Sequence, residues 1–417
     1  MNMDCEIITI GDEIMTGHRV DTNAALIAQQ LTSIGLEVRY RSSVGDSLEA
    51  MEECFRLAMR RARVIITTGG LGPTDDDITK RAIVKVFKRN LIFHEDILED
   101  IRHRFAERKT EMPAINQNQA LLPQGATPFP NKHGTALGIC ISEKGRVFIA
   151  LPGVPFEMEQ IMLDEVIPYF QRMNIGTPVK MVSLKTIGIV ESELAELITP
   201  ELSLDRNIKL AYLPSPSGIE LRVIATADTD SEAKERAQKT ARDIEGAIGH
   251  YIFGYDKDVL EGVIAQLLMD NDRTLAVAES CTGGQLGQII TSVSGSSKYF
   301  LGGVIAYAND VKINQLGVDS ATIDQYGAVS AECAKEMATG CRKKFESDYA
   351  LAITGIAGPE GGTDDKPVGT TFIGLSSIHE TYARPFNFGT LRRINRTRAV
   401  YAALEMLRRE ILDIKEN

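Results

Sequence analysis

Thr67-Thr68-Gly69-Gly70-Leu71-Gly72-Pro73-Thr74-Asp75-Asp76-Asp77 is the segment that indicates the fold most directly. It begins with the last two residues of an apolar run at residues 63–68 and continues beyond that run. A short apolar run that ends at glycines predicts a buried strand followed by a tight loop. Glycines let backbone N–H groups approach a phosphate closely, and a carboxylate cluster beside such a loop suits a divalent cation. This stretch therefore predicts an α/β sheet with a ligand loop at the carboxyl end of one strand.

The sequence around this loop alternates between strand and helix patterns. It predicts strands at residues 5–10, 36–42 and 63–68 and helices at residues 22–34, 48–61 and 78–88. Such alternation is typical of a parallel sheet whose two faces are covered by helices. Two short strands, at residues 136–142 and 146–150, and a helix that ends near residue 170 complete this part.

A second glycine segment, Gly11-Asp12-Glu13-Ile14-Met15-Thr16-Gly17, directly follows the first predicted strand. Open α/β sheets bind ligands at the carboxyl ends of their strands, so both loops are candidate binding loops. A turn followed by an acidic helix start explains the same residues without a ligand, because aspartates also cap helices. The residues alone leave both interpretations open.

The remaining chain divides into two further parts. Gly176 and Pro178 lie in a stretch without apolar periodicity, which predicts a linker. Residues 180–252 predict a small α+β unit with a hairpin loop at Pro214-Ser215-Pro216-Ser217-Gly218. The strand and helix alternation resumes near residue 259. We therefore expect three domains, at residues 1–173, 174–256 and 257–417.

Composition excludes several classes of protein. The 417 residues are 43% hydrophobic and 25% charged, which excludes disordered, collagen-like and coiled-coil chains. The net charge is −11, from 46 basic and 57 acidic residues, so no global basic footprint for nucleic acid or anionic membranes exists. No apolar run approaches the ~20 residues of a membrane span. We expect no membrane partner.

The six cysteines include no pair at CxxC spacing, so neither a zinc knuckle nor a redox motif is indicated. A disulfide framework is not expected in a chain of this length, which favours a reducing compartment. The first residues lack the basic region of a signal peptide. We therefore expect a cytoplasmic protein.

Ala278-Glu279-Ser280-Cys281-Thr282-Gly283-Gly284 stands between a predicted buried strand and a helix. A small polar residue at such a turn lies beside helix N–H groups, which suits a nucleophile next to an oxyanion hole. Ser280 and Cys281 are both candidates by chemistry. None of the six histidines lies in the C-terminal motifs, so a serine would need another base, and a desolvated lysine can serve.

Three further C-terminal segments carry candidate residues. The segment Ala306-Tyr307-Ala308-Asn309-Asp310-Val311-Lys312 supplies a lysine and a tyrosine, but from the residues alone a helix capped by Asn309 with an exposed lysine is the better explanation. The segment from Thr354 to Thr370 predicts either a glycine-rich loop that encloses a ligand or a flexible surface hairpin. The start of the last helix holds Arg392, Arg393 and Arg396, and their spacing leaves open which of them meets a phosphate.

The N-terminal motifs resemble the CinA family and the related MogA/MoaB-type molybdopterin-binding domains. The resemblance rests on Ile10-Gly11-Asp12-Glu13, Asp21-Thr22-Asn23 and the segment from Thr68 to Thr79, in that order. It implies a three-layer α/β domain with ADP-ribose pyrophosphatase activity that depends on a divalent cation of the Mg, Mn or Co type. The implied nucleotide and phosphate ligands are Gly11, Glu13, Asn23, Gly69, Gly70, Gly72 and Asp77, and the implied metal ligands are Asp75, Asp76 and Asp77.

Residues 259–412 resemble the CinA C-terminal domain, a nicotinamide mononucleotide amidohydrolase that requires no cofactor. The resemblance makes Ser280 the nucleophile, Lys312 the general base and Tyr307 a proton relay or orienting group, and it places Thr282 at the oxyanion site. The substrate-binding residues that it implies are Glu279, Gly283, Gly284, Asn309, Thr354, Gly355, Gly358, Arg392 and Arg396. The family also implies a homodimer.

The middle unit resembles the KH-like domain of full-length CinA proteins. Gly246-Ala247-Ile248-Gly249 has the letters of a nucleic-acid clamp, but its central residues are apolar and bring no cation to a phosphate. We expect a packed helix end that acts as a spacer. Two alternatives stay open, a molybdopterin or nucleotide binder without hydrolysis and a competence-related scaffold that binds nucleic acid.

Overall fold

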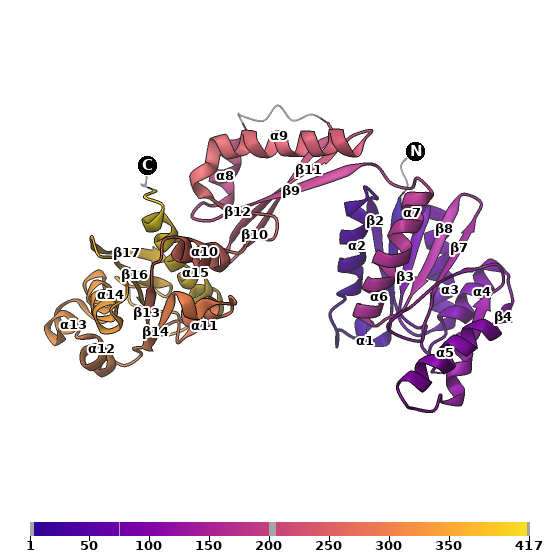
Figure 1. The fold of residues 1–417 in the computed structure, drawn as a ribbon, viewed down its shortest axis with the longest axis horizontal. Helices are drawn as coiled ribbons and strands as arrows, with labels where there is room; N and C mark the ends of the chain where they lie inside the picture. Colours follow the sequence, from indigo (N-terminus) through magenta and orange to yellow (C-terminus); the bar gives the residue numbers. More distant parts are fainter. Residues whose placement is uncertain (1–3, 75, 200–205, 415–417) are drawn as a thin grey trace. The chain divides into compact units, whose positions relative to one another are not determined.

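The computed structural model describes residues 4–74, 76–199 and 206–414 (Figure 1). Contacts divide the chain into two compact units, residues 1–180 with 226–234 and residues 181–225 with 235–417. The first unit holds the N-terminal sheet. The second holds both the middle sheet and the C-terminal sheet.

The N-terminal sheet has six strands in the order β2-β1-β3-β8-β7-β6. The first four are parallel, and β7 and β6 each pair antiparallel with the preceding neighbour. The strands of this unit are β1 (Cys5–Ile10), β2 (Val38–Val44), β3 (Val64–Thr68), β4 (Leu91–Phe93), β5 (Leu121–Pro123), β6 (Thr127–Phe129), β7 (Gly138–Glu143) and β8 (Arg146–Leu151), with β4 and β5 forming a separate two-stranded ribbon.

Helices cover both faces of this sheet, which makes the predicted three layers (Figure 1). Alternate residues along each strand pack into hydrophobic cores on opposite faces of the sheet. Ile7 and Ile66 pack with Ile27 of α2, whereas Ile8 packs with Phe55 of α3 on the other face. The helices are α1 (Asp12–Met15), α2 (Asn23–Ser33), α3 (Leu48–Arg61), α4 (Thr79–Phe87), α5 (Glu95–Glu107), α6 (Pro155–Ile161), α7 (Ile167–Arg172) and the 3₁₀ segment η1 (Ala114–Ala120).

The single helix predicted to end near residue 170 is interrupted. A π-helical segment, η2 (Met162–Val166), separates α6 from α7. Pro168 has no N–H to donate to the carbonyl four residues earlier, so a regular α-helix loses a hydrogen bond there. Both helical parts still bury their apolar side chains, since Met158 and Phe170 are fully covered.

The middle sheet has the strand order β10-β11-β9-β12 and packs against α8 and α9. The predicted hairpin at residues 214–218 is confirmed by the antiparallel register of β10 with β11. Ile248 ends α9 and is fully buried, so Gly246–Gly249 contributes a packed helix end. The elements are β9 (Val179–Thr186), α8 (Glu191–Ile198), β10 (Ile208–Ser215), β11 (Gly218–Thr226), α9 (Asp230–Ile248), η3 (Gly249–Tyr251) and β12 (Ile252–Tyr255).

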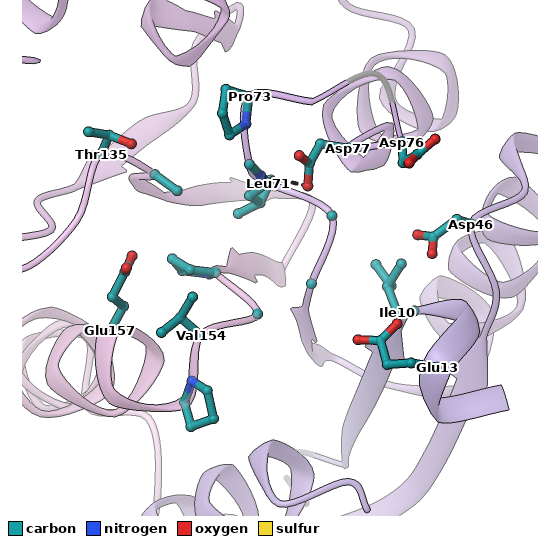
Figure 2. Close-up of a pocket in the computed structure, with 18 of the residues that line it drawn as sticks. Ile10, Glu13, Asp46, Leu71, Pro73, Asp76, Asp77, Thr135, Val154 and Glu157 are labelled. Atoms are coloured by element: carbon teal, nitrogen blue, oxygen red, sulfur yellow. Dashed lines mark hydrogen bonds between the residues drawn. The ribbon is translucent and has the colours of Figure 1, made fainter. Parts of the chain in front are cut away.

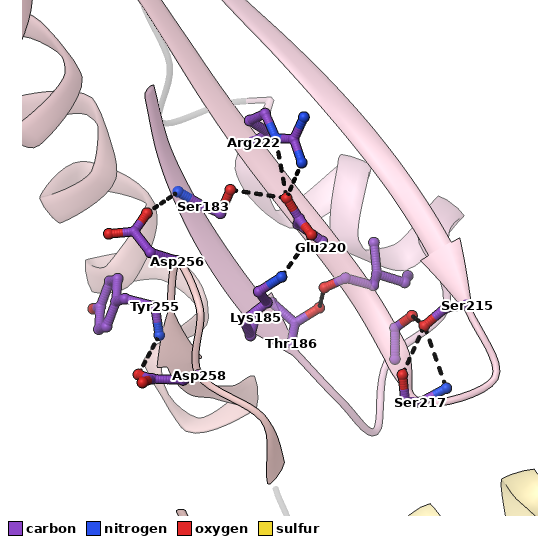
Figure 3. A network of polar contacts seen from close by, with 12 residues as sticks. Ser183, Lys185, Thr186, Ser215, Ser217, Glu220, Arg222, Tyr255, Asp256 and Asp258 are labelled. Carbon is purple, nitrogen blue, oxygen red and sulfur yellow. Dashed lines mark hydrogen bonds and ion pairs between the residues drawn. The ribbon is translucent and has the colours of Figure 1, made fainter. Parts of the chain in front are cut away.

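A polar network on this sheet centres on the carboxylate of Glu220 (Figure 3). Glu220 accepts hydrogen bonds from Ser183 Oγ at 2.8 Å, from Lys185 Nζ at 2.6 Å and from the guanidinium of Arg222. Partial burial raises the pKa of Glu220, but these donors outweigh it and bring the pKa to about 2. One carboxylate therefore binds both cations and offsets half of their combined charge, which weakens their attraction for phosphate groups.

The C-terminal sheet has the order β14-β13-β15-β16-β17. β13 pairs in parallel with both β14 and β15, and β16 and β17 continue the sheet antiparallel. The elements are α10 (Leu260–Asp270), β13 (Leu275–Glu279), α11 (Gln285–Thr291), η4 (Ser296–Lys298), β14 (Phe300–Ile305), α12 (Asn309–Leu316), α13 (Ser320–Tyr326), α14 (Ala331–Phe345), β15 (Tyr349–Gly355), β16 (Thr370–Ser376), β17 (Thr381–Asn387) and α15 (Arg392–Ile411).

The two faces of the C-terminal sheet pack differently. Large aliphatic side chains such as Val277 and Ile353 meet α10, α11 and α15. The opposite face presents small residues such as Ala278 and Ala352 to α14. A Cβ at Gly374 would lie 2.3 Å from the carbonyl oxygen of Ala334, so α14 approaches the sheet too closely for a side chain there.

Buried charges join α15 to the middle sheet. Arg408 is 2% exposed, pairs with Glu405 at 2.7 Å and donates to the backbone carbonyl of His250 at 2.8 Å. Both charges are thus compensated by hydrogen bonds away from water. Among the described residues, no helix combines the length and the apolar character that crossing a membrane requires.

The Glu220 network predicts a change in acid stability. Since the pKa of Glu220 is lowered to about 2 in the folded chain, its stabilisation is present above the usual pKa of 4.5 and is lost as pH falls toward 2. We expect Glu220→Gln to destabilise the second unit by about 1 kcal/mol at pH 7, a partly exposed ion-pair network being worth no more than that.

Differential scanning calorimetry across pH 2 to 7 measures this difference. The gap between wild type and Glu220→Gln should close as the pH approaches 2. A gap that persists unchanged at the lowest pH would contradict the charge-based explanation.

Candidate functional site

The turn after β13 places Ser280 at the edge of the C-terminal sheet. The Ser280 amide donates to the carbonyl of Ile353 at 2.9 Å, so the residue stays paired to β15 although β13 has ended. The chain then reverses at Gly283 and Gly284, whose φ values of 57° and 95° favour glycine. Helix α11 begins at the next residue.

Lys312 reaches Ser280 from α12, on the other side of this turn. Lys312 Nζ lies 3.2 Å from Ser280 Oγ, 2.9 Å from the carbonyl oxygen of Ala306 and 3.1 Å from that of Tyr307. The two side chains are buried, with Lys312 1% and Ser280 9% exposed. An amine held beside a hydroxyl with little water present is the arrangement that a serine–lysine pair requires.

The electrostatics of this pair favour the serine over the neighbouring thiol. Burial lowers the pKa of Lys312, which increases the neutral amine that can accept a proton. Burial raises the pKa of Cys281 to about 11, although Arg392 and Arg396 oppose that shift. The thiol is therefore protonated at neutral pH, and thiols react as thiolates. Ser280, whose hydroxyl contacts Lys312 Nζ, is the candidate nucleophile that the geometry supports.

Most backbone N–H groups of the turn already have acceptors. The amide of Gly283 donates to Ser280 O, and the amides of Gly284, Leu286 and Gly287 donate to the carboxylate of Glu279. Within the described residues, the amides of Cys281 and Thr282 donate to no other residue. These two amides are the available donors for an oxyanion next to Ser280.

A cationic cavity of about 550 Å³ borders the same turn. The sequence singled out its two glycines and three arginines but not its glutamines. Its lining residues are Gly283, Gly284, Gln285, Gln288, Arg392, Arg393, Arg396 and Thr397. Arg396 Nη2 donates to the carbonyl oxygen of Thr282 at 2.5 Å, and its Nε is buried without a partner in the described structure. Such a group suits an anionic ligand.

The other residues predicted for the C-terminal site differ in their exposure and in their hydrogen-bond partners. Tyr307 is 61% exposed, and its backbone carbonyl rather than its ring meets Lys312. Asn309 is exposed at the start of α12. Thr354 is buried and donates to the carbonyl of Ala328, and Gly355 ends β15. The carbonyl of Gly358 accepts from Arg392 at 2.9 Å.

Asn395 is a structural contributor that the sequence reasoning missed. Its amide nitrogen donates to the carbonyl oxygens of Ala357 and Gly389, which ties α15 to two loops. Asn395 is 2% exposed, and its side-chain oxygen has no partner in the described structure. A polar residue one turn inside a helix carries no signal that could have revealed this contact.

The N-terminal unit has its own pocket, about 500 Å³ in volume, at the carboxyl ends of β1 and β3. Figure 2 shows Glu13, Asp46 and Asp76 on one side of it and Thr135, Val154 and Glu157 on the other. The predicted Gly11, Gly69, Gly70, Gly72 and Asp77 also line it. The strand order therefore brings the two predicted glycine loops together.

The carboxylate of Asp77 organises the glycine loop. It accepts from the amide of Gly72 at 2.8 Å, from the amide of Thr74 at 2.9 Å and from Thr74 Oγ1 at 2.6 Å. Asp76 is exposed and lies on the same side of the pocket as Asp46 (Figure 2). Asp75, a predicted metal ligand, lies outside the described residues.

Asn23 connects two loops beside this pocket. Its amide nitrogen donates to Thr68 Oγ1 and to the carbonyl oxygen of Gly153, each at 2.9 Å. The side chain is 7% exposed and is absent from the pocket lining. Asn23 thus holds the end of β3 against the loop after β8.

Asp46 and Glu157 are pocket carboxylates that the sequence reasoning missed, because each stands far in sequence from the glycine motifs. Burial and the nearby charges of Asp12, Glu13 and Asp76 raise the pKa of Asp46, against a hydrogen bond from the Asp12 amide. A cation would relieve this crowding. Within the described ranges, no three histidine, cysteine or acidic side chains form a ready-made metal site. A cation here would therefore draw part of its ligand set from a bound phosphate.

Known protein families match three successive parts of the chain. The family described as "Probable molybdopterin binding domain" matches residues 6–172, "Damage-inducible protein CinA KH domain" matches residues 182–254, and "CinA C-terminal domain" matches residues 257–411. These matches confirm the predicted fold class.

Full-length relatives show the same likeness. A putative competence-damage inducible protein of Halothermothrix orenii is 42% identical over 408 residues, which is 98% of each chain. A CinA-like protein of Cytophaga hutchinsonii is 39% identical over 415 residues, again 98% of each chain. A crystal structure of CinA from Thermoplasma acidophilum is 33% identical and covers 42% of this chain and 98% of its own, with a TM-score of 0.37. The chain therefore belongs to the CinA family.

Proposed function

We propose that the C-terminal domain hydrolyses the carboxamide of nicotinamide mononucleotide to nicotinate mononucleotide and ammonia. The observation that carries this proposal is the buried contact of 3.2 Å between Lys312 Nζ and Ser280 Oγ. The adjacent arginine cavity supports a substrate with a phosphate group, since guanidinium groups bind phosphate through paired hydrogen bonds.

The reaction uses residues already in contact. Neutral Lys312 accepts the proton of Ser280 as Oγ bonds to the carboxamide carbon, and the amides of Cys281 and Thr282 stabilise the oxyanion. The protonated Lys312 returns the proton to the departing amine, and ammonia leaves an acyl-serine. Water then adds to the ester carbon, Lys312 takes its proton, and nicotinate mononucleotide departs as Ser280 is restored.

We further propose that the N-terminal pocket hydrolyses the pyrophosphate of ADP-ribose or a related nucleotide with a bound divalent cation. Glu13, Asp46 and Asp76 would hold the cation, and the glycine loop would face the phosphates. A bound cation supplies charge neutralisation for the pyrophosphate. The crowded carboxylates that line the pocket support a bound cation, which is the observation behind this second proposal.

The first prediction concerns the serine–lysine pair. Ser280→Ala should abolish ammonia release from nicotinamide mononucleotide, and Lys312→Met should lower kcat by about 100–10,000-fold, the usual contribution of a general base. Activity should rise with pH as Lys312 loses its proton, with a midpoint below the ordinary lysine value of 10.5. A coupled ammonia assay measures both effects.

Matched controls are exposed residues of the same type in the same domain. Ser292→Ala and Lys298→Met should keep wild-type turnover, because both side chains are exposed. Cys281→Ala should retain most activity. Full turnover in Ser280→Ala, or a loss confined to Cys281→Ala, would refute the assignment of the nucleophile.

The second prediction concerns Asp46. The raised pKa means that ionised Asp46 costs stability at neutral pH, a cost that grows as pH rises through the folded pKa. Asp46→Asn should therefore raise the Tm of the N-terminal unit in chelator. Wild type should gain Tm with Mg²⁺ or Mn²⁺, and the variant should gain less.

Activity gives the same test a second readout. Asp46→Asn should lose AMP release from ADP-ribose while it keeps deamidation, and Ser280→Ala should show the reverse pattern. Asp96→Asn is the control, because the Asp96 side chain is 84% exposed on α5. Nucleotide binding without AMP release in wild type would favour a binder over a hydrolase. Binding of single-stranded nucleic acid with a strong salt dependence would favour the scaffold alternative.

A further inference from the structure

Glu279 is the last residue of β13 and stands directly before the nucleophile. Its side chain is 2% exposed, a rare position for a carboxylate. Oε2 accepts the amides of Gly284 and Leu286, each at 3.0 Å, and Oε1 accepts the amide of Gly287 at 2.8 Å. Both oxygens are thus used by the protein's own backbone.

These hydrogen bonds join the two ends of the turn. The strand end at Glu279 is tied across residues 280–283 to the first turn of α11, so the intervening segment cannot open without breaking charged hydrogen bonds. The carboxylate also occupies the positive N-terminal end of α11, where it interacts favourably with the helix dipole. The amides of Gly284, Leu286 and Gly287 are therefore taken by Glu279, and the arginines of the neighbouring cavity remain as phosphate ligands.

The same contacts use most of the amides of the turn. Three N–H groups of the turn and helix point to Glu279, and that of Gly283 points back to Ser280 O. The amides of Cys281 and Thr282 remain, on the two residues that follow Ser280. Both residues lie between the strand end and the two glycines with positive φ, on a segment whose far end is anchored by the carboxylate.

We propose that Glu279 is a positioning residue that holds the amides of Cys281 and Thr282 in place as an oxyanion site, and is not a substrate ligand. The proposal rests on the amide hydrolysis proposed for Ser280. It differs from the expectation that Glu279 binds substrate, because both carboxylate oxygens are engaged. A free carboxylate near the arginine cavity would also repel the phosphate.

Glu279→Gln tests this role. Glutamine keeps the shape and one acceptor oxygen, but its NH₂ group meets a backbone N–H where a carboxylate oxygen stood. The amides should shift, and kcat should fall by about 100-fold, the effect of losing or misplacing one oxyanion donor. KM for nicotinamide mononucleotide should stay near the wild-type value, because the arginines are unchanged. Calorimetric binding of nicotinate mononucleotide counts the folded sites, and kcat is expressed per binding site.

Asp348→Asn is the matched control: Asp348 directly precedes β15, and its carboxylate binds Thr274 at the opposite end of β13 from Glu279. Asp348 accepts the amide and the hydroxyl of Thr274, each at 2.8 Å, directly before β13 begins. This variant removes a comparable capping carboxylate far from Ser280. Its Tm should fall, while its kcat per binding site should match wild type.

The outcomes separate the two proposals. A wild-type chain without deamidase activity, or full activity in Ser280→Ala, overturns the amidase and the role of Glu279 together. An active wild type with unchanged kcat in Glu279→Gln overturns only the positioning role, as does a raised KM at unchanged kcat. If Glu279→Gln binds no product, Glu279→Asp is judged by the same criteria, since it keeps the charge and displaces the oxygens.

Discussion

Parallel hydrogen bonding on both sides of one central strand is the constraint on which each outer domain depends. β1 lies between β2 and β3, and β13 lies between β14 and β15, all in parallel. Parallel neighbours end at the same edge, so loops from distant parts of the chain meet there. In both domains the central strand is buried along its length, and a described pocket lies at the edge where that strand ends.

The two edges carry opposite charge. The N-terminal pocket gathers Glu13, Asp46, Asp76 and Glu157, whereas the C-terminal cavity gathers Arg392, Arg393 and Arg396. An acidic pocket needs a cation before it can hold a phosphate, and a basic cavity does not. The net charge of −11 therefore describes neither site. The acidic N-terminal pocket would repel a phosphate group, and the basic C-terminal cavity would attract it. This contrast is consistent with one metal-assisted site and one that works without metal.

Desolvation provides the reactivity proposed for the C-terminal site. Water around Lys312 would keep it protonated and inert as a base, and burial beside Ser280 disfavours that charge. The small residues between the sheet and α14 bring the helical layer of that face close to the sheet, which helps to keep water from Lys312. Two backbone carbonyls then orient the amine toward the hydroxyl. The packing of alanines and the chemistry of the lysine are thus parts of one arrangement.

Local patterns in the sequence determined the strand and helix alternation, the glycine loops and the turn that holds Ser280 and Cys281, because apolar periodicity and turn chemistry act within a few residues. Lys312 was singled out only by the resemblance to the CinA family. The local pattern left the nucleophile open between Ser280 and Cys281, and the folded chain places Lys312 Nζ against the Ser280 hydroxyl while burial raises the pKa of the Cys281 thiol. Likewise, Asp46, Glu157 and Asn395 have ordinary sequence surroundings and acquire roles by long-range contact. Glu279 was found by sequence, but its partners were decided by the tertiary structure, since a carboxylate binds whichever donors the turn places within 3 Å of it.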